Sequence, residues 1–124
     1  MSTGIVLFAH GARDPDWARP LERLKRMLGD RMPDALIENA FLEHMAPTLE
    51  DAASLLIARG ATEISVVPVF IAQGGHLRED LPKRVEALGV LHPGVPVRIA
   101  PPIGEVDTIL ASVAGWIEAM HKPG

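Results

Sequence analysis

The sequence predicts an α/β fold: one domain in which four parallel strands, in the order 2-1-3-4, carry helices on both faces. Four short apolar runs alternate with four segments of helical periodicity, which is the pattern of β-α-β units. The two clearest runs are almost continuously apolar, as expected for strands covered on both faces. At 124 residues, without a linker or an internal repeat, we predict a single domain over residues 1–124.

The apolar runs give the predicted strands. They span Gly4–Ala9, Ala35–Leu42, Ile64–Ala72 and Val95–Ala100. Pro68 lies inside the third run, and because proline cannot donate a ladder hydrogen bond we expect a local bulge there. Right-handed crossovers leave few arrangements of these strands, and 2-1-3-4 is the order we predict.

Apolar residues at spacings of three and four give the predicted helices. The four sets run from Trp17 to Leu28, Leu49 to Leu56, Leu77 to Leu88 and Val106 to Met120. Each set follows one of the apolar runs, so strand and helix alternate along the whole chain.

Proline and glycine mark the expected helix boundaries. Pro15 and Pro47 stand where a first helical turn tolerates proline. Gly29, Gly60 and Gly89 each follow a periodic segment, where a left-handed residue would end a helix.

Composition and charge exclude several classes of function. The net charge of −4 and the scarcity of aromatic residues argue against nucleic acid as a partner. The absence of cysteine excludes disulfides and thiolate metal sites, and it fits a reducing compartment. No segment resembles a signal peptide or a membrane span, so we expect a cytoplasmic protein with no membrane partner.

Candidate metal ligands follow three of the predicted strands. His10 follows the first strand, Glu43 the second and His76 the third. In the order 2-1-3-4 the first and third strands are neighbours where the strand order reverses, and sites in open parallel sheets form there. We therefore expect His10 and His76 to face each other, with Glu43 one strand further along. Imidazole and carboxylate groups suit divalent cobalt, iron, nickel or zinc.

Glycines stand beside the same candidate ligands. Gly11 permits a tight turn after His10, and Gly74 and Gly75 permit a loop to pass close to a bulky planar ligand, although ordinary turns explain each glycine equally well. Neither glycine-rich phosphate-binding pattern occurs, so no nucleotide cofactor is expected.

Basic and apolar residues flank the candidate ligands. Arg13 and Arg78 lie within three residues of a candidate ligand, where they would suit a substrate that carries several carboxylates. Met45 and Leu77 are candidates for an apolar wall against a flat ligand, with core packing as an equal alternative. Other polar side chains are expected to be solvated: Arg19, Lys83, Arg84, His92 and His121.

Three motifs carry a resemblance to a known family. They are Val6–Pro15, Ala40–Glu43 leading to Pro47, and Val67–Pro82. In this order and spacing they resemble the small CbiX-type and SirB-type sirohydrochlorin chelatases. The resemblance runs in register from about Gly4 to the final helix.

The resemblance implies an activity and a set of residues. The family inserts divalent cobalt or iron, and in some relatives nickel, into sirohydrochlorin in cobalamin or sirohaem biosynthesis, without ATP. Its metal-binding histidines match His10 and His76, and its acidic partner matches Glu43. Longer relatives contain two such units, so this chain resembles a half unit and a homodimer is implied. His44 departs from the leucine or alanine expected there, which leaves open whether it joins the site.

Alternative functions differ in the residues they require. A phosphohistidine phosphatase needs an arginine where this chain has Ala9, and a receiver domain needs paired acids after the first strand. A non-catalytic metal or tetrapyrrole carrier on the same fold remains open, since it would bind cobalt or nickel without turnover.

Overall fold

Four parallel strands form one sheet in the order β2-β1-β3-β4 in the computed structural model, which describes residues 2–122. The strands are β1 (Thr3–Ala9), β2 (Leu36–Phe41), β3 (Glu63–Pro68) and β4 (Val97–Ile99). In the central register, Val6 of β1 lies between Glu38 of β2 and Val66 of β3. The predicted fold class and strand order are confirmed.

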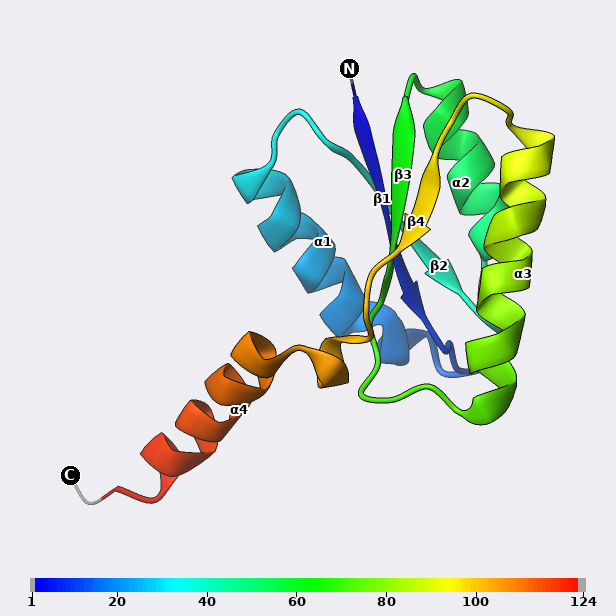
Figure 1. Ribbon diagram of the computed structural model, residues 1–124. Coiled ribbons are helices and arrows are strands. Elements are labelled where there is room, and N and C mark those ends of the chain that lie inside the picture. Colours follow the sequence, from blue (N-terminus) through cyan, green and yellow to red (C-terminus); the bar gives the residue numbers. More distant parts are fainter. Residues whose placement is uncertain (1, 123–124) are drawn as a thin grey trace.

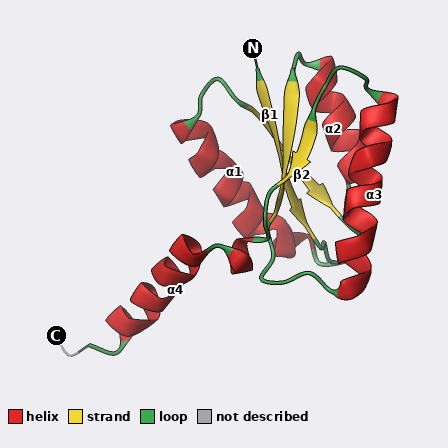
Figure 2. Cartoon of the chain, viewed as in Figure 1, coloured by secondary structure: helices red, strands yellow, loops and turns green. Residues whose placement is uncertain are grey.

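Helices lie on both faces of the sheet, and a fourth extends away from it (Figures 1 and 2). The short 3-10 helix η1 (Pro15–Ala18) leads into α1 (Arg19–Arg31), which packs against β2 on one face. On the other face are α2 (Leu49–Ala58) and α3 (Gly75–Leu91). A second 3-10 turn, η2 (Ile103–Glu105), precedes α4 (Asp107–Met120). No helix within residues 2–122 has the length and apolar character needed to cross a membrane.

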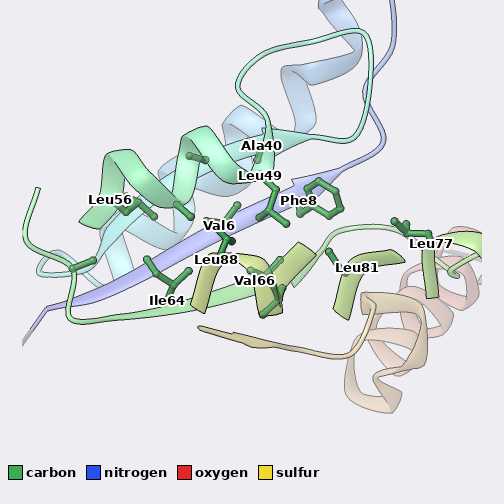
Figure 3. Close-up of a cluster of buried hydrophobic side chains, with 14 of the residues drawn as sticks. Val6, Phe8, Ala40, Leu49, Leu56, Ile64, Val66, Leu77, Leu81 and Leu88 are labelled. Atoms are coloured by element: carbon green, nitrogen blue, oxygen red, sulfur yellow. The ribbon is translucent and has the colours of Figure 1, made fainter. Parts of the chain in front are cut away.

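The main core lies between the sheet and the pair α2 and α3 (Figure 3). On β3, side chains alternate: Ile64, Val66 and Pro68 are buried under these helices, whereas Ser65 and Val67 are only partly covered. By contrast, β1 is buried on both faces after Thr3, because α1 covers its other side. This double coverage explains why the first apolar run is continuous in the sequence.

Three glycines were expected to mark helix ends, and the expectation is correct for one of them. Gly60, with φ +108°, follows α2 as predicted. Gly29 and Gly89 instead lie inside α1 and α3. Each helix continues for two more residues and ends where a backbone N–H, that of Met32 or His92, donates to the carbonyl four residues earlier.

Two proline predictions need correction. Pro15 begins η1 as predicted, but Pro47 lies before α2, because Thr48 is the N-cap and its hydroxyl accepts the N–H of Asp51 at 3.2 Å. Pro68 is the last residue of β3, so the strand ends there instead of continuing to Ala72 with a bulge.

Candidate metal site at the carboxyl edge of the sheet

Backbone hydrogen bonds join the loops after β1 and β2. The N–H of Leu42 donates to the carbonyl of Ala9 at 2.9 Å, and the N–H of Glu43 donates to the carbonyl of His10 at 3.0 Å. The parallel ladder therefore continues past the strand ends. It holds two of the three candidate ligands, His10 and Glu43, side by side at the carboxyl edge.

Gly11 allows these two loops to approach each other. Its φ is +91°, a conformation that L side chains rarely adopt. A Cβ at this position would also overlap the carbonyl oxygen of Glu43. Glycine is thus required here by backbone conformation and by contact, not only by an ordinary turn.

Aromatic rings support the imidazole of His10. The residue is half-buried, and its ring centre lies 4.9 Å from that of Phe70. Phe70 in turn packs edge-on against Phe8, at 6.5 Å between ring centres. His10 continues the face of β1 that carries Val6 and Phe8, because side chains two positions apart share a face. The alternation along β1 predicts that His10 shares a face with Phe8, whereas the contact with Phe70 depends on the loop after β3.

An ion pair between α2 and α3 lies beneath these rings. Arg84 donates to both carboxylate oxygens of Glu50, at 2.7 and 2.8 Å, and its guanidinium carbon lies 5.7 Å from the Phe8 ring centre. The hydrogen bonds from Arg84 lower the pKa of Glu50. The Arg84 side chain is 20% exposed, so the prediction of a solvated residue is wrong.

Glu43 and His44 present their side chains together to solvent. Glu43 Oε2 lies 3.9 Å from His44 Nε2, and both residues are exposed. His44 adopts a left-handed backbone conformation with φ +65°. The structure therefore places His44 beside Glu43, which the sequence left open.

His76 lies in the first turn of α3, at the same edge of the sheet. It is exposed, and the N-cap residue Gly74 provides no side-chain cap. Pro68 ends β3 eight residues earlier, so His76 belongs to the helix start and not to the strand end. A Cβ at Gly74 or Gly75 would meet nothing within 4 Å, so neither glycine is required by packing within this chain.

The remaining candidate residues separate into surface and core. Arg13 is exposed, as is Arg78, whose guanidinium reaches the carbonyl of Gln73 at 3.5 Å. Met45 is half-buried against the cluster under α1. Leu77 lies in the main core with 7% of its surface exposed (Figure 3), so core packing accounts for it.

The candidate ligands do not form a closed metal centre within one chain. In residues 2–122, no three side chains of His, Asp or Glu gather closely enough to hold a metal ion. His10 and His76 follow neighbouring strands, as expected, and their face-to-face arrangement stays a prediction. An ion bound at this edge would take its other ligands from water or from another molecule.

Two further histidines lie away from the candidate site. His92 follows α3 at the opposite end from His76 and is half-buried, with its Nε2 3.1 Å from the hydroxyl of Ser54. The prediction that His92 is solvated is therefore wrong. His121 is exposed after α4, as predicted.

Comparison with known proteins identifies the family. The CbiX family model matches residues 4–118. The chain belongs to the CbiX family. It is 34% identical over 110 residues to a sirohydrochlorin cobaltochelatase of Sulfurisphaera tokodaii, covering 89% of this chain and 86% of that protein. A protein of the same name from Saccharolobus islandicus is 33% identical over 123 residues, covering 96% and 88%.

Solved structures share the fold of this CbiX chain. A structure assigned as a cobalamin (vitamin B12) biosynthesis CbiX protein from Marinobacter aquaeolei VT8 has a TM-score of 0.81 and 30% identity, covering 95% of this chain and 93% of that one. SirB from Bacillus subtilis with Fe3+ has a TM-score of 0.80 and 24% identity, covering 99% of this chain but only 49% of SirB. This CbiX chain therefore corresponds to one half of a SirB-length protein.

Proposed function

We propose that this CbiX protein inserts a divalent metal ion, Co²⁺ or Fe²⁺ with Ni²⁺ as a further candidate, into sirohydrochlorin without a nucleotide cofactor. The observation that carries the proposal is the similarity to sirohydrochlorin cobaltochelatases over 89 to 96% of the chain. The fixed placement of His10 beside Glu43 at the carboxyl edge supports it. The ion is a substrate of the reaction, along with the macrocycle.

His10 and His76 are the proposed ligands of the incoming ion. Neutral imidazole binds cobalt, iron and nickel, and the contact with Phe70 limits how the His10 ring can turn. Because one chain offers no closed three-ligand centre in its described part, the ion keeps coordination positions for water and for the macrocycle nitrogens. Weak, incomplete coordination suits an ion that must be released into the product.

Glu43 is the proposed acceptor of the two pyrrole protons that the macrocycle loses. Its carboxylate is exposed at the same edge and is held beside His10 by the backbone bond between their loops. His44, whose Nε2 lies 3.9 Å from that carboxylate, would receive each proton from it through a bridging water molecule and pass the proton to solvent. This route moves charge away from the ion as the ion enters the ring.

Two exposed arginines, two glycines and one methionine form the proposed contact with the macrocycle. Arg13 and Arg78 would hold its peripheral carboxylates. Packing within the chain does not require glycine at Gly74 or Gly75. Close passage of a planar ligand is the proposed explanation for glycine at these two positions. Met45 would supply an apolar contact through its partly exposed side chain.

A homodimer is the proposed working form. The chain covers 49% of a SirB chain of the same fold, so two copies would supply what one SirB chain contains. Each copy would bring its own His10 and Glu43 to a cleft between the two carboxyl edges.

The activity is tested by anaerobic insertion assays. Sirohydrochlorin is mixed with Co²⁺, Fe²⁺ or Ni²⁺ at equal concentrations, with and without the protein, and the absorbance of the metallated ring is followed. We expect repeated turnover with at least one ion. Binding of ion or ring without turnover would instead identify a carrier.

The residues are tested in the same assay. His10→Ala and His76→Ala should each lower the rate by at least about 100-fold, because loss of even an outer-shell partner of a metal ligand costs about 10- to 100-fold. His92→Gln is the matched control, because it alters a histidine at the other end of α3 and should leave the rate unchanged. Full activity of both alanine variants would contradict the assignment.

A further inference from the structure

The imidazole of His10 lies at the end of a series of packed side chains. Its ring centre is 4.9 Å from that of Phe70, with 44° between the ring planes. The Phe70 ring meets Phe8 edge-on, at 6.5 Å and 67°, and the guanidinium carbon of Arg84 lies 5.7 Å from the Phe8 ring centre. We call these four side chains the ring stack. It connects a candidate metal ligand to the core between the sheet and α3.

The inner end of the ring stack is held by an ion pair and by the core. Arg84 of α3 donates to both carboxylate oxygens of Glu50 on α2, and a bidentate pair of this kind fixes the plane of the guanidinium. Phe8 is fully buried in the main core (Figure 3). The surface against which the Phe70 ring packs is therefore set by the fold and does not depend on a bound ion.

The backbone of Phe70 is anchored on both sides, although β3 has already ended. The N–H of Val69 donates to the carbonyl of Phe8 at 2.7 Å, which continues the parallel ladder past the end of the strand. The carbonyl of Phe70 accepts the N–H of Gly104 at 3.4 Å, and a Cβ at Gly104 would overlap the carbonyl oxygen of Ile71. The loop after β3 therefore has little room to shift, and it holds the Phe70 ring beside His10.

An imidazole that binds a metal needs a neighbour that fixes its orientation. Rotation about χ2 of histidine is broad, so an unsupported ring does not keep its nitrogen lone pair in one direction. In metal sites the second ring nitrogen usually donates a hydrogen bond that sets this angle. Within residues 2–122 the ring of His10 has no such hydrogen-bonding partner, in contrast to His92, which is paired with Ser54. The contact with Phe70 is available to take this role.

We propose that Phe70 is the positioning residue for His10, and that its ring holds the imidazole plane in the orientation in which a nitrogen receives the ion. The inference rests on the proposed function, in which His10 is a ligand of the incoming ion. Phe70 itself does not touch the ion. Because the imidazole is oriented before the ion arrives, the contact raises the affinity for the ion and leaves recognition of the macrocycle unchanged.

Calorimetric titration with Co²⁺ alone tests the positioning role, with His10→Ala defining the part of the binding that depends on His10. Phe70→Leu keeps an apolar side chain and removes the ring, and we expect its Co²⁺ affinity to fall about 10-fold, as when a group that orients a metal ligand is lost. Phe70→Tyr keeps the ring and should retain the wild-type affinity. Phe41→Leu is the matched control, because it removes a buried ring on the other face of the sheet and should also bind Co²⁺ like wild type.

Insertion kinetics and NMR separate positioning from a general loss of stability. Phe70→Leu should raise the KM for Co²⁺ about 10-fold and leave the KM for sirohydrochlorin unchanged. A variant that is only less stable would instead show a lower apparent kcat with both KM values unchanged, because less of the protein is folded. In the metal-free protein, the resonances of the His10 ring protons should move in Phe70→Leu and not in Phe41→Leu, since only the first variant removes the adjacent aromatic ring.

The outcomes separate this inference from the proposed function. Wild-type Co²⁺ affinity in Phe70→Leu, together with lost binding in His10→Ala, would overturn the positioning role and leave the proposed function intact. An equal loss of affinity in Phe70→Leu and Phe70→Tyr would also overturn it, because the ring would then not be the cause. Co²⁺ binding that is unchanged in His10→Ala would contradict the ligand assignment of the proposed function, and the positioning role would fall with it.

Discussion

Gly11 shows how a single backbone conformation assembles part of the candidate site. Its positive φ and its contact with the Glu43 carbonyl bring the loops after β1 and β2 together. An alanine there must both adopt a left-handed conformation and displace a backbone atom. Since the displaced segment carries Glu43, the substitution should disturb stability and site together.

Gly11→Ala should lower the free energy of unfolding by at least about 2 kcal/mol, measured by urea denaturation at pH 7. Gly74→Ala is the comparison, because Gly74 has φ −68° and open space around it. Because Gly74 is the N-cap of α3, that variant should lower the free energy of unfolding by at most about 1 kcal/mol, and it should slow insertion because Gly74 is proposed to contact the ligand. Equal stability of the two variants would contradict the role given to Gly11.

The pair formed by Glu50 and Arg84 makes stability depend on pH. Because the pKa of Glu50 is lowered in the folded chain, its contribution is present at neutral pH and is lost as the pH falls through the folded-state pKa. Glu50→Gln should cost about 1 kcal/mol at pH 7, a modest value because Glu50 is 41% exposed and screened by water.

The difference between Glu50→Gln and wild type should narrow as the pH falls through the lowered pKa of Glu50 in the folded chain, where the wild-type carboxylate also becomes neutral. Urea denaturation at several pH values measures it. Glu118→Gln removes an exposed carboxylate paired with Lys122 and should have no comparable effect. A cost for Glu50→Gln that persists unchanged at pH 3 would show that charge is not its cause.

At the residue scale, the sequence predicted where the candidate ligands lie better than it predicted the side chains around them. His10 and Glu43 follow from the ends of β1 and β2, because parallel strands bring their carboxyl ends to one edge. The contact between His10 and Phe70 depends on how a loop folds back over β1, which spacing alone does not determine. Sequence spacing likewise does not predict the ion pair of Arg84, because its partner Glu50 lies 34 residues away on another helix.

Among the elements, α2 depends on its N-cap. Thr48 accepts the N–H of Asp51, and the first turn carries two acidic residues. Thr48→Ala should lower the free energy of unfolding by about 1 kcal/mol in urea denaturation. Thr48→Ser retains an acceptor oxygen and should recover most of that loss. Equal destabilisation by both variants would mean that the methyl group, and not the cap, is responsible.

Element types were predictable from the sequence, and element ends were not. Glycine in a helix costs only about 1 kcal/mol relative to alanine, so α1 and α3 continue through Gly29 and Gly89 when packing favours it. A proline can either end a strand or cause a bulge within it, and β3 ends at Pro68. Helical periodicity predicted α4 but carried no information on what its apolar face contacts.

For the whole molecule, α4 contributes no buried residue to its own chain. A chain that ends at Glu105 should therefore fold, with a thermal midpoint that does not depend on protein concentration. The midpoint of the full chain should rise with concentration, because the proposed homodimer stabilises the folded state by mass action. Circular dichroism melts across a 100-fold concentration range measure both.

Val113→Glu in the full-length chain checks this result without truncation. It should melt like the shortened chain, with a midpoint independent of concentration. A shortened chain that retains the concentration dependence of the full chain would place the contact between copies elsewhere on the molecule.

The positions of the two tryptophans have an optical consequence. Trp17 lies in η1 and is 43% exposed, Trp116 lies on α4 and is 64% exposed, and the chain contains no tyrosine. An indole that a second copy covers in the proposed homodimer loses water, and its emission then moves to shorter wavelength. The intrinsic fluorescence of the unlabelled protein would then report formation of the proposed homodimer, in dilute solutions as well as in concentrated ones.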